Sequence, residues 1–546
     1  MRAIEAGLTF LQNQGVRFIF GIPAGSINAL YDVLMDMPEL KPVIVKHETS
    51  AGYMAAAYTR ISGLPSVCTG SSGPGATNLV TAAANAWIEK LPILFITGSV
   101  PSTKIGKGGA QELDAVSIFT SITKYSRLVP DAHSLPLMIE EAFITAISGV
   151  PGPVHLSIPI DLQMVDIGSY QTPQIRYPVP LEPDDHSIEK AVKLIEAAKQ
   201  QGVLLLGHGA KPARMEIIRF AEQTGWMVAT TPRGKGAFPE DHPQSLGIYG
   251  LSGNRQAIEK LNGIHHDVII VVGSSLGELA TCNWEKRLVA GKQLIHIDRD
   301  KKEFNKNYIA DLTICGDARI VMGRLVASLP DSGENKIIRQ SFDKTSENEN
   351  NPNWNTQAAI NHIGANAPDN ARFYLDIGEF MTYSLHNLRI IKDQQFDIDI
   401  NFGAMGSGIG GAIGAQLAEP DRPVICVTGD GCFFMHGLEV LTAKEYHLPI
   451  LFVIINNARL GMVHHGHMLQ YKRCLGNFSQ DRIDLSAVVK AMGIRSAQVA
   501  SLDDIHPDQI HEWLSYGEPI VIEVIVDGNE VPPMGERVKF LEGATY

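Results

Sequence analysis

Residues 423–457, PVICVTGDGCFFMHGLEVLTAKEYHLPILFVIINN, contain two apolar runs that both end in oxygen-bearing side chains. The first run stops at Gly-Asp-Gly (429–431) and the second at Asn-Asn (456–457), with 24 residues between the two groups. Two apolar runs separated by a helix-length segment are typical of a βαβ unit in a parallel sheet. In a doubly wound sheet, ligands bind beyond the carboxyl ends of the strands. We therefore expect Asp430 and Asn457 to stand at one edge of a sheet and to face a ligand.

The same alternation of β-rich runs and helical patterns continues along the whole chain. It predicts an α/β fold with three doubly wound parallel-sheet domains. The predicted boundaries give an N-terminal domain over 1–165, a central domain over 186–330 and a C-terminal domain over 356–546. The Pro-rich stretch 170–185 and the polar run 343–355 are expected to be the linkers between them. The first and third segments look like a weakly similar pair.

The composition excludes several classes of protein. The 546 residues carry 59 acidic and 46 basic side chains, a formal net charge of −13, and no basic block that could neutralise a nucleic-acid backbone. The N-terminus reads as an amphipathic helix ending at Gly15, without the apolar core of a signal peptide, and no apolar stretch reaches about 18 residues. The six cysteines are scattered without paired spacing, which indicates reduced thiols. We expect a cytoplasmic protein that binds neither nucleic acid nor membrane.

Asp430 and Asn457 offer the kind of ligand that magnesium prefers. Carboxylate and amide oxygens are hard ligands, and Mg²⁺ usually shares its octahedral coordination with phosphate oxygens. The glycines on both sides of Asp430 let the backbone approach a bulky anion. A helix expected to begin near Met435 would point its N-terminal amides at the same place, which favours a diphosphate. Each group alone would read as a turn; their joint occurrence after two β runs favours a ligand site.

This pattern resembles the thiamine-diphosphate fingerprint, in which Gly-Asp-Gly is followed by Asn-Asn after a helix-length spacer. Further segments follow the order of that family: FGIPAG (20–25), KHETSAGYMAAAYTR (46–60), GSSGPGATN (70–78), GPVHLSIPID (152–161), GAFPEDHP (236–243), HIDRD (296–300), GAMGSG (403–408) and LGMV (460–463). The resemblance covers nearly the whole chain and is nearest to the acetolactate (acetohydroxyacid) synthase branch. It implies that Asp430, Asn457 and the main-chain carbonyl of Arg459 bind Mg²⁺ beside thiamine diphosphate.

The resemblance also gives a role to Glu48, which the sequence places at the start of a helix. An acid in a first helical turn is commonly just a partner of the helix dipole. In the family the matching glutamate hydrogen-bonds the aminopyrimidine ring of the cofactor and helps to activate it, a case of general acid–base catalysis. Because Glu48 lies in the first domain and the metal ligands in the third, the resemblance places the cofactor between two subunits of a homodimer or homotetramer. Gln111 matches an active-site glutamine of the family; its alternative reading is a solvated loop residue.

The remaining cofactor contacts that the resemblance implies come from glycine-rich segments and their neighbours. They are Pro23, Gly25, Thr77, Asn78, Gly378, Gly403, Met405, Gly429, Gly431, Cys432 and Met462. Met405 would hold the cofactor bent, although an isolated methionine ordinarily belongs to a core. The substrate pocket is expected to include Lys124, Val463, His465 and Gly466, with a solvated lysine as the alternative for Lys124.

The reaction implied by the resemblance is decarboxylation of a 2-oxo acid, with pyruvate expected, and transfer of the acyl unit to a second carbonyl compound. With a second pyruvate the product is 2-acetolactate. Two other classes stay open. One is another enzyme of the same superfamily: a decarboxylase or lyase, which releases an aldehyde or acyl phosphate, or an acyloin-forming enzyme with a different acceptor. The other is a non-catalytic homologue, against which the joint presence of Glu48, Asp430 and Asn457 counts.

Two segments depart from the family pattern. Where anabolic relatives carry an Arg-Phe-Asp loop that contacts FAD, this chain has GSSLGEL (273–279). The Gly-His-Gly turn (207–209) and Asp298 could still hold a dinucleotide, but a short GxG is weak evidence, and we expect no tightly bound FAD. Where the biosynthetic enzymes have Gln-Trp, this chain has His465 and Gly466 in GMVHHGHM (461–468). We expect these histidines on a loop, where solvated histidines are common, and a wider, more polar acceptor site.

Overall fold

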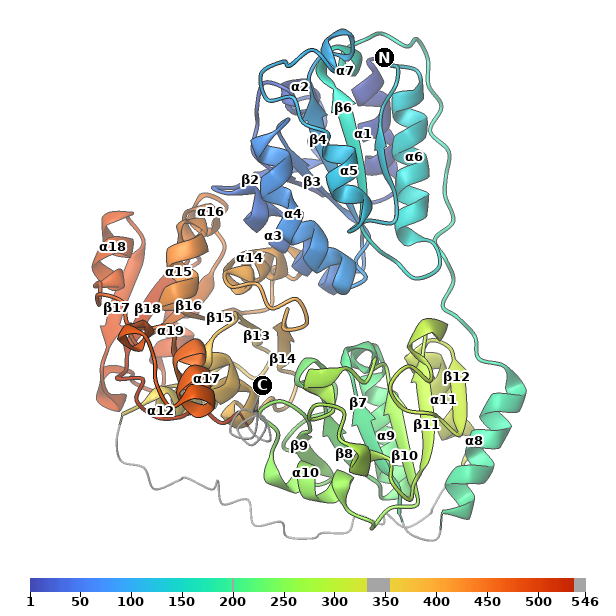
Figure 1. Ribbon diagram of the computed structural model, residues 1–546, viewed down its shortest axis with the longest axis vertical. Coiled ribbons are helices and arrows are strands. Elements are labelled where there is room, and N and C mark those ends of the chain that lie inside the picture. The colour runs from blue at the N-terminus through green and yellow to red at the C-terminus, as the bar shows by residue number, and fades with distance from the viewer. Residues whose placement is uncertain (199–200, 331–353, 535–546) are drawn as a thin grey trace.

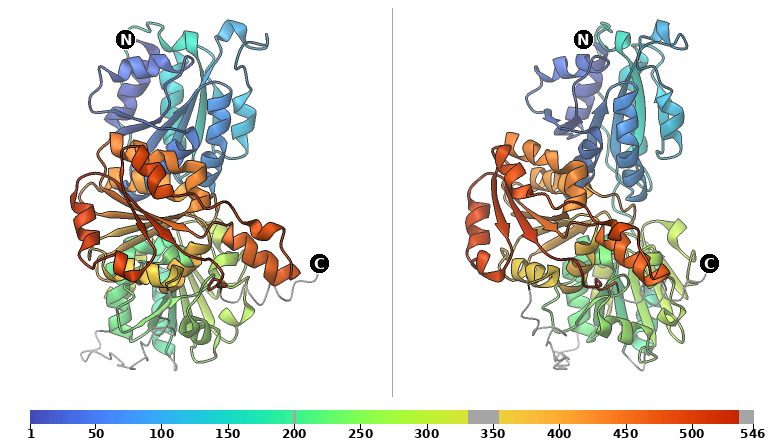
Figure 2. Two further views of the ribbon diagram at one scale, coloured as in Figure 1. Left: turned by 90° about the vertical axis from the view of Figure 1, so that its left-hand side faces the viewer. Right: turned by 60° about the vertical axis from the view of Figure 1, so that its left-hand side comes forward.

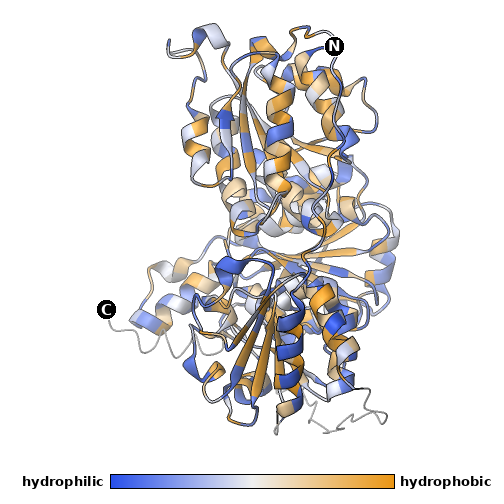
Figure 3. Ribbon diagram, turned by 90° about the vertical axis from the view of Figure 1, so that its right-hand side faces the viewer, coloured by the Kyte–Doolittle hydropathy of each residue, from blue (hydrophilic) through white to orange (hydrophobic). Residues whose placement is uncertain are grey.

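The computed structural model describes residues 1–198, 201–330 and 354–534. All eighteen strands in this part of the chain belong to three six-stranded sheets, in which every strand pair is parallel (Figure 1). Helices cover both faces of each sheet, and the strands are the most apolar layer (Figure 3). The predicted class of three doubly wound α/β domains is thus confirmed. The predicted boundaries stay predictions, and most of the predicted linker 343–355 lies outside the described residues.

The first sheet has the strand order β2-β1-β3-β4-β6-β5. Its strands are β1 (Phe18–Gly21), β2 (Lys41–Ile44), β3 (Ser66–Gly70), β4 (Ile93–Ser99), β5 (Ser126–Leu128) and β6 (Val154–Pro159). Its helices are α1 (Ala3–Asn13), α2 (Asn28–Leu34), α3 (Glu48–Ser62), α4 (Pro74–Ile88), α5 (Ala115–Thr120), α6 (Ser134–Ile147) and α7 (Ile160–Gln163), with the 3₁₀ turn η1 (Ser102–Lys104). Residues 170–184 then run as an extended segment without helix or strand toward the next domain (Figure 1).

The central sheet has the order β12-β11-β10-β7-β8-β9. When these strands are renumbered 1 to 6 in chain order and the sheet is read from β9, the order is 3-2-1-4-5-6. This is the strand order of dinucleotide-binding folds. Its strands are β7 (Val203–Leu206), β8 (Met227–Thr230), β9 (Ser245–Ile248), β10 (Val268–Val272), β11 (Gln293–Asp298) and β12 (Leu312–Cys315). The helices are α8 (Asp185–Ala197), α9 (Arg214–Thr224), α10 (Arg255–Asn262) and α11 (Ala318–Ser328), with 3₁₀ turns η2 (His208–Ala213), η3 (Pro232–Gly234), η4 (Glu278–Ala280), η5 (Lys286–Leu288) and η6 (Lys301–Glu303).

The third sheet has the order β14-β13-β15-β16-β18-β17, the same winding as the first sheet. Its strands are β13 (Arg372–Leu375), β14 (Gln395–Ile398), β15 (Val424–Gly429), β16 (Ile450–Asn456), β17 (Arg495–Val499) and β18 (Ile520–Ile525). The helices are α12 (Thr356–Ala365), α13 (Glu379–Asn387), α14 (Ser407–Ala418), α15 (Asp430–His436), α16 (Val440–Glu445), α17 (Gly461–Tyr471), α18 (Leu485–Ala491) and α19 (Gln509–Ser515), with 3₁₀ turns η7 (Gly437–Glu439), η8 (Gly476–Phe478) and η9 (Leu502–Asp504). The shared winding agrees with the expected similarity of the first and third segments.

Helices α3 and α14 join the first and third domains (Figures 1 and 2). Helix α14 is built largely from glycine, alanine and isoleucine, so its backbone can approach its neighbour closely. A Cβ added at Gly414 would lie 2.1 Å from the carbonyl oxygen of Met54, and one added at Gly410 would lie 3.1 Å from that of Ser50. One continuous apolar cluster, including Phe95 and Ile413, extends through both domains. The two domains therefore share a core.

A group of buried charges lies where all three domains meet. The Arg60 guanidinium of α3 donates to the Tyr374 hydroxyl at 2.8 Å, pairs with Asp399 of the third domain, and lies 3.5 Å from the Glu89 carboxylate that follows α4. Arg233 of the central domain pairs with the same Glu89. The side chains of Glu89 and Asp399 are fully buried. Removing one partner of such a buried pair typically costs about 3–5 kcal/mol, so these charges fix the three domains to one another.

Gly414→Val should lower the free energy of unfolding by about 1–3 kcal/mol, because the new side chain overpacks the contact between α14 and α3. Chemical or thermal unfolding measures the change. Gly323→Ala, inside α11, is the matched control: its new Cβ meets only the Glu216 side chain at 3.8 Å. Loss of a helix-interior glycine there should raise stability by about 0.5–1 kcal/mol. Undiminished stability of the valine variant would contradict the packing described here.

Candidate functional site

Three neighbouring strands of the third sheet are followed directly by polar side chains. Asp376 follows β13, Asp430 follows β15, and Asn457 follows β16. The order of strands reverses between β13 and β15, which is the switch point where ligands bind in doubly wound sheets. The sheet thus brings Asp430 and Asn457 to one edge, as the sequence predicted.

Asp430 is almost fully buried and holds two main-chain segments together. Its Oδ1 accepts a hydrogen bond from the Gly431 N–H at 2.8 Å, and its Oδ2 accepts one from the Ala458 N–H at 2.9 Å. Burial raises the pKa of this carboxyl group to about 6. Helix α15 begins at Asp430 itself, so the prediction that it begins near Met435 was wrong. The strand passes into the helix without a loop because Gly429, in extended conformation, is its N-cap residue.

Asn457 lies against a second buried acid, Glu379, at the start of α13. The Asn457 Nδ2 donates to the Glu379 Oε2 at 3.2 Å, and the Asn457 Oδ1 accepts from the Arg459 N–H at 3.2 Å. Burial raises the pKa of Glu379 to about 8, Arg459 opposes the shift, and the neighbouring charge of Asp430 adds to it. Ala458, which separates Asn457 from Arg459 in the chain, has a φ of 54°. This is a strained conformation for a residue with a side chain, and such strain is frequent at functional sites.

The donor set at this edge fits a hard divalent cation. Two buried carboxyl groups with raised pKa lie near each other, and a cation beside them would stabilise their charged forms. In the described residues, no group of three or more His, Cys, Asp and Glu side chains could hold a metal ion by itself. The two carboxyl groups of Asp430 and Glu379 match the coordination of Mg²⁺, which takes one or two carboxylates from the protein and completes its shell with phosphate oxygens.

Most of the predicted cofactor contacts of the third domain gather around the same edge. A Cβ on Gly431 would lie 3.1 Å from the Met405 Cε, and Cβ atoms on Gly378 and Gly429 would both meet the Phe380 ring. Cys432 is buried, with its Sγ donating to the carbonyl oxygen of Ile377 at 3.0 Å. Met405 and Met462 are partly buried against the apolar cluster that contains Phe380 and Cys432. Gly403, with a φ of 73°, turns the chain just before Met405.

Glu48 begins α3, as predicted, and lies in a polar corner of the first domain. Its side chain is largely buried, and its Oε2 accepts a hydrogen bond from the Asn78 Nδ2 at 2.9 Å. A Cβ on Gly75 would lie 3.2 Å from the Glu48 Oε1, so the glycine leaves room for the carboxylate. The carbonyl oxygen of Gln111 accepts from the Ser72 hydroxyl at 2.7 Å, which places the Gln111 loop beside the same segment.

Four predicted residues of the first domain lie on its surface. The side chain of Gln111 is exposed, as are Thr77 on α4 and the Pro23–Gly25 turn after β1. This turn and the 70–78 segment follow β1 and β3, between which the strand order of the first sheet reverses. In the described residues no hydrogen bond or ion pair joins Glu48 to Asp430 or Asn457. Each domain therefore presents its own half of the predicted site.

The predicted substrate-pocket residues differ from one another in burial and surroundings. Residues 461–471 form the helix α17, so the prediction of a loop was wrong. His465 is buried rather than solvated: its Nε2 lies 3.2 Å from the Gly528 carbonyl oxygen and 3.6 Å from the Glu379 Oε2. Val463 is half exposed, and a Cβ on Gly466 would meet nothing within 4 Å. Glu379, the acid that lies against His465 of this helix, was not recognised from the sequence.

Lys124 does not lie with these residues. Its Nζ donates to the carbonyl oxygens of Thr145, Ser148 and Val150 at 2.6, 2.7 and 2.9 Å, and burial lowers its pKa. A lysine that binds the last carbonyls of a helix stabilises the negative end of the helix dipole. These contacts describe a cap of α6.

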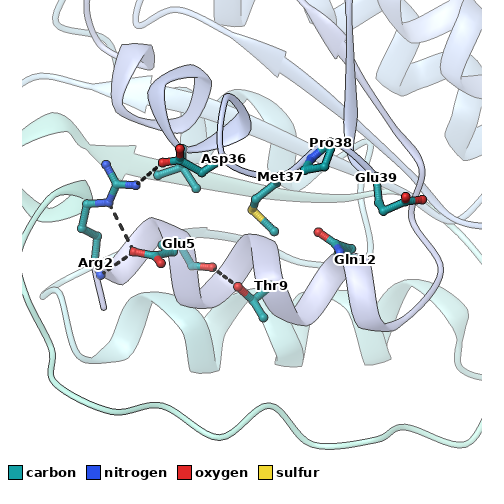
Figure 4. Close-up of a pocket in the computed structure, with 9 residues that line it drawn as sticks. Arg2, Glu5, Thr9, Gln12, Asp36, Met37, Pro38 and Glu39 are labelled. Atoms are coloured by element: carbon teal, nitrogen blue, oxygen red, sulfur yellow. Dashed lines mark hydrogen bonds and ion pairs between the residues drawn. The ribbon is translucent and has the colours of Figure 1, made fainter.

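One surface hollow also lies apart from the site. It measures about 360 Å³ and runs between α1 and the segment after α2, lined by Gln12, Met37 and several charged residues (Figure 4). Arg2 pairs there with Glu5 at 3.3 Å and with Asp36 at 3.6 Å. The predicted site residues are absent from its lining.

Comparison with known proteins agrees with this arrangement. Three family models match consecutive parts of the chain: the thiamine pyrophosphate enzyme N-terminal TPP binding domain over 1–118, the central domain over 188–325 and the C-terminal TPP binding domain over 376–524. The chain belongs to the thiamine pyrophosphate enzyme family. The first and third family domains carry the two half-sites described above, which makes Glu48 and Asp430 members of TPP-binding domains.

Relatives within the family extend over the whole chain. The large subunit of acetolactate synthase isozyme 1 from Escherichia coli K12 is 32% identical, over 96% of this chain and 94% of its own length. Chloroplastic acetolactate synthase 1 from Nicotiana tabacum is 32% identical, over 96% of this chain and 82% of its own length. The X-ray structure of a candidate thiamin diphosphate-dependent enzyme from Mycobacterium smegmatis aligns with a TM-score of 0.81 at 23% identity, over 96% of this chain and 99% of that one, and shows the shared fold.

Two acids of this TPP-binding domain were missed in the sequence. Asp376 is fully buried, and its oxygens accept from the N–H groups of Ile377 and Gly406, both at 2.8 Å, and from the Thr428 hydroxyl at 3.0 Å. Glu379 follows three residues later. For Asp376, the stretch ARFYLDIG (371–378) has a signal like the one that identified Asp430, an apolar run that ends in an acid with a glycine two residues later.

Asp430→Ala should abolish binding of thiamine diphosphate in the presence of Mg²⁺, because a carboxylate that would hold the cation is lost. Isothermal titration calorimetry measures the affinity. Asp421→Ala, which removes an exposed carboxylate of the same domain, is the control and should bind as the unmodified protein does. Undiminished affinity of the Asp430 variant would refute the metal-ligand assignment.

Proposed function

We propose that the protein is a thiamine-diphosphate-dependent carboligase of the acetolactate synthase type. It decarboxylates a 2-oxo acid, pyruvate in the first place, and transfers the acyl unit to a second carbonyl compound. The observation that carries the proposal is the pair of polar half-sites, Glu48 at the start of α3 and Asp430 with Asn457 at adjacent strand ends. Acetolactate synthases that match nearly all of the chain give the reaction class.

Each of these residues has a distinct task in the proposed mechanism. Asp430, Asn457 and the main-chain carbonyl of Arg459 would hold Mg²⁺, and the glycines around Asp430 would let the backbone come close to the diphosphate. Glu48 would hold a proton for the aminopyrimidine ring, the role of a positioned general acid–base group. When bound, thiamine diphosphate supplies the carbanion chemistry. Met405 and the apolar residues around it exclude water, which favours loss of a charged carboxylate.

Glu48 lies in the first TPP-binding domain and Asp430 and Asn457 in the other, which, with the family resemblance, supports a catalytic site formed between two subunits. We propose a homodimer or homotetramer in which Glu48 of one chain faces the Asp430 region of another. Its partners are a small 2-oxo acid and a carbonyl acceptor. In the part of the chain that the structure describes, no helix is long and apolar enough to cross a membrane. The proposed location is the cytoplasm.

We propose that the central domain works without tightly bound FAD. Its Gly-His-Gly turn (207–209) is packed against the end of β10: the Gly209 N–H donates to the Gly273 carbonyl oxygen at 3.0 Å. A Cβ on Gly207 would lie 2.2 Å from that same oxygen. The cavity beside these glycines is about 50 Å³ and also includes Arg233, which is paired with Glu89. The glycines thus serve the protein's own packing.

Product analysis by mass spectrometry with pyruvate, Mg²⁺ and thiamine diphosphate tests the proposed reaction. A carboligase gives 2-acetolactate, detected as acetoin after acid treatment, whereas a simple decarboxylase gives acetaldehyde. Release of acetaldehyde alone would refute the carboligase.

Glu48→Gln should retain the cofactor but slow hydrogen–deuterium exchange at its thiazolium carbon by about 10²–10⁴-fold, the usual contribution of general acid–base catalysis. Exchange at the rate of the unmodified protein would mean that Glu48 is only a partner of the helix dipole.

The open space at Gly466 predicts a wide acceptor site. In competition between pyruvate, 2-oxobutyrate and a bulky aldehyde, the protein should show no marked preference for 2-oxobutyrate and should use the aldehyde. Gly466→Trp should exclude the aldehyde, because an aromatic ring occupies about 150–250 Å² of surface. Gly466→Ala is the control, which should change little. Strong preference for 2-oxobutyrate in the unmodified protein would show that another part of the chain narrows the pocket.

A further inference from the structure

The segment that leads into Glu48 lies at the edge of its own domain, where the Val45 N–H donates to the Gly21 carbonyl oxygen at 3.3 Å. Strand β2 is at the edge of the first sheet and pairs only with β1. An edge strand presents unpaired N–H and C=O groups on its free side. Residues 45–47 connect the end of β2 to Glu48 at the start of α3. The position of the Glu48 backbone therefore depends on what holds this connection from the other side.

Glu439 of the third domain holds this connection directly. Its Oε1 accepts hydrogen bonds from the N–H groups of both Lys46 and His47, each at 2.9 Å. Its Oε2 accepts from the Thr442 hydroxyl at 2.8 Å, which fixes the carboxylate in place. Glu439 is only 1% exposed. A carboxylate this deeply buried requires strong hydrogen-bond donors, and the two amides immediately before Glu48 are those donors.

The third domain also contacts β2 and the Lys46 side chain, and these contacts do not involve the two amides. The Tyr446 hydroxyl accepts from the Ile44 N–H at 2.7 Å and donates to the Pro42 carbonyl oxygen at 3.0 Å, on the free edge of β2. The Lys46 Nζ pairs with Glu445 at 2.6 Å on the surface, where the Glu445 side chain is half exposed. The ion pair between Lys46 and Glu445 serves as a control for the effect of Glu439, because it joins the same two parts of the chain through side chains alone.

We propose that Glu439 is a positioning residue for Glu48. By holding the amides of residues 46 and 47, it sets where α3 begins and therefore where the Glu48 carboxylate stands relative to the cofactor. The inference rests on the role of Glu48 in the proposed function. A proton-sharing group must lie within about 2.6–3.2 Å of its partner, and a displacement of about 1 Å can cost about 10²-fold in rate. Glu439 itself touches neither cofactor nor substrate.

The test measures hydrogen–deuterium exchange at the thiazolium carbon of thiamine diphosphate bound to the full-length protein with Mg²⁺. Cofactor affinity and melting temperature are measured on the same samples. Glu439→Met keeps the length of the side chain but removes both acceptor oxygens. It should slow exchange by about 10–100-fold, in line with a displaced catalytic group, while cofactor affinity stays within about threefold. A residue that only joins two domains would alter the melting temperature and leave this exchange rate unchanged.

Three further variants make the result specific. Glu439→Gln keeps an oxygen that can accept from both amides and should restore exchange close to the unmodified rate. Glu445→Gln removes only the exposed ion pair to Lys46 and should have no effect. Glu439→Asp shortens the side chain by one carbon and should slow exchange partially, so it serves as the test if the methionine variant does not fold. Unmodified exchange in the Met or Asp variant, or equal slowing in the Gln variant, overturns the proposal.

Glu48→Gln, measured in parallel, separates this inference from the proposed function. Unmodified exchange in Glu48→Gln would refute the catalytic role of Glu48 and the role of Glu439 with it. Slow exchange in Glu48→Gln together with unmodified exchange in Glu439→Met would refute only the positioning role.

Discussion

The close packing of α3 on α14 is the contact on which the rest of the structure depends. Helix α3 carries Glu48 at its first residue, and α14 directly follows the loop that contains Gly403 and Met405. The two backbones can come this near because Gly410 and Gly414 have no Cβ atom. The helix pair therefore sets the relative position of two TPP-binding domains whose sheets have the same winding. A shift of either helix would move the Glu48 carboxylate with respect to the loop that contains Gly403 and Met405.

The features that could be read from the sequence are those that depend on neighbouring residues. The apolar runs before Asp430 and Asn457 identify buried parallel strands, and parallel strands carry their carboxyl ends to the same edge. The start of α3 at Glu48 follows from the strand-like run KPVIVK before it and the helical pattern after it. The three-domain α/β class follows from the same alternation over the full length.

The features that could not be read depend on contacts distant in sequence. Glu379 is recognised only when α13 places it against Asn457 and His465. His465 is buried because α17 places its ring beside the Gly528 carbonyl oxygen, a neighbour 63 residues away that no local signal identifies. Lys124 resembles a substrate-binding lysine until the end of α6 supplies three carbonyl oxygens for its ammonium group. In each case a tertiary contact decides the environment of a polar side chain.

The charges shared at the domain junction have a consequence for how the protein can be divided. Arg60 and Glu89 come from the first domain, Arg233 from the central domain, and Asp399 and Tyr374 from the third. Although each sheet looks like a separate module, an isolated domain would expose an apolar surface and leave charged groups without their partners. The three domains should therefore melt in one cooperative transition. Exchanging a domain with that of a relative would preserve a folded chimera only if the whole set of charged partners came from one parent.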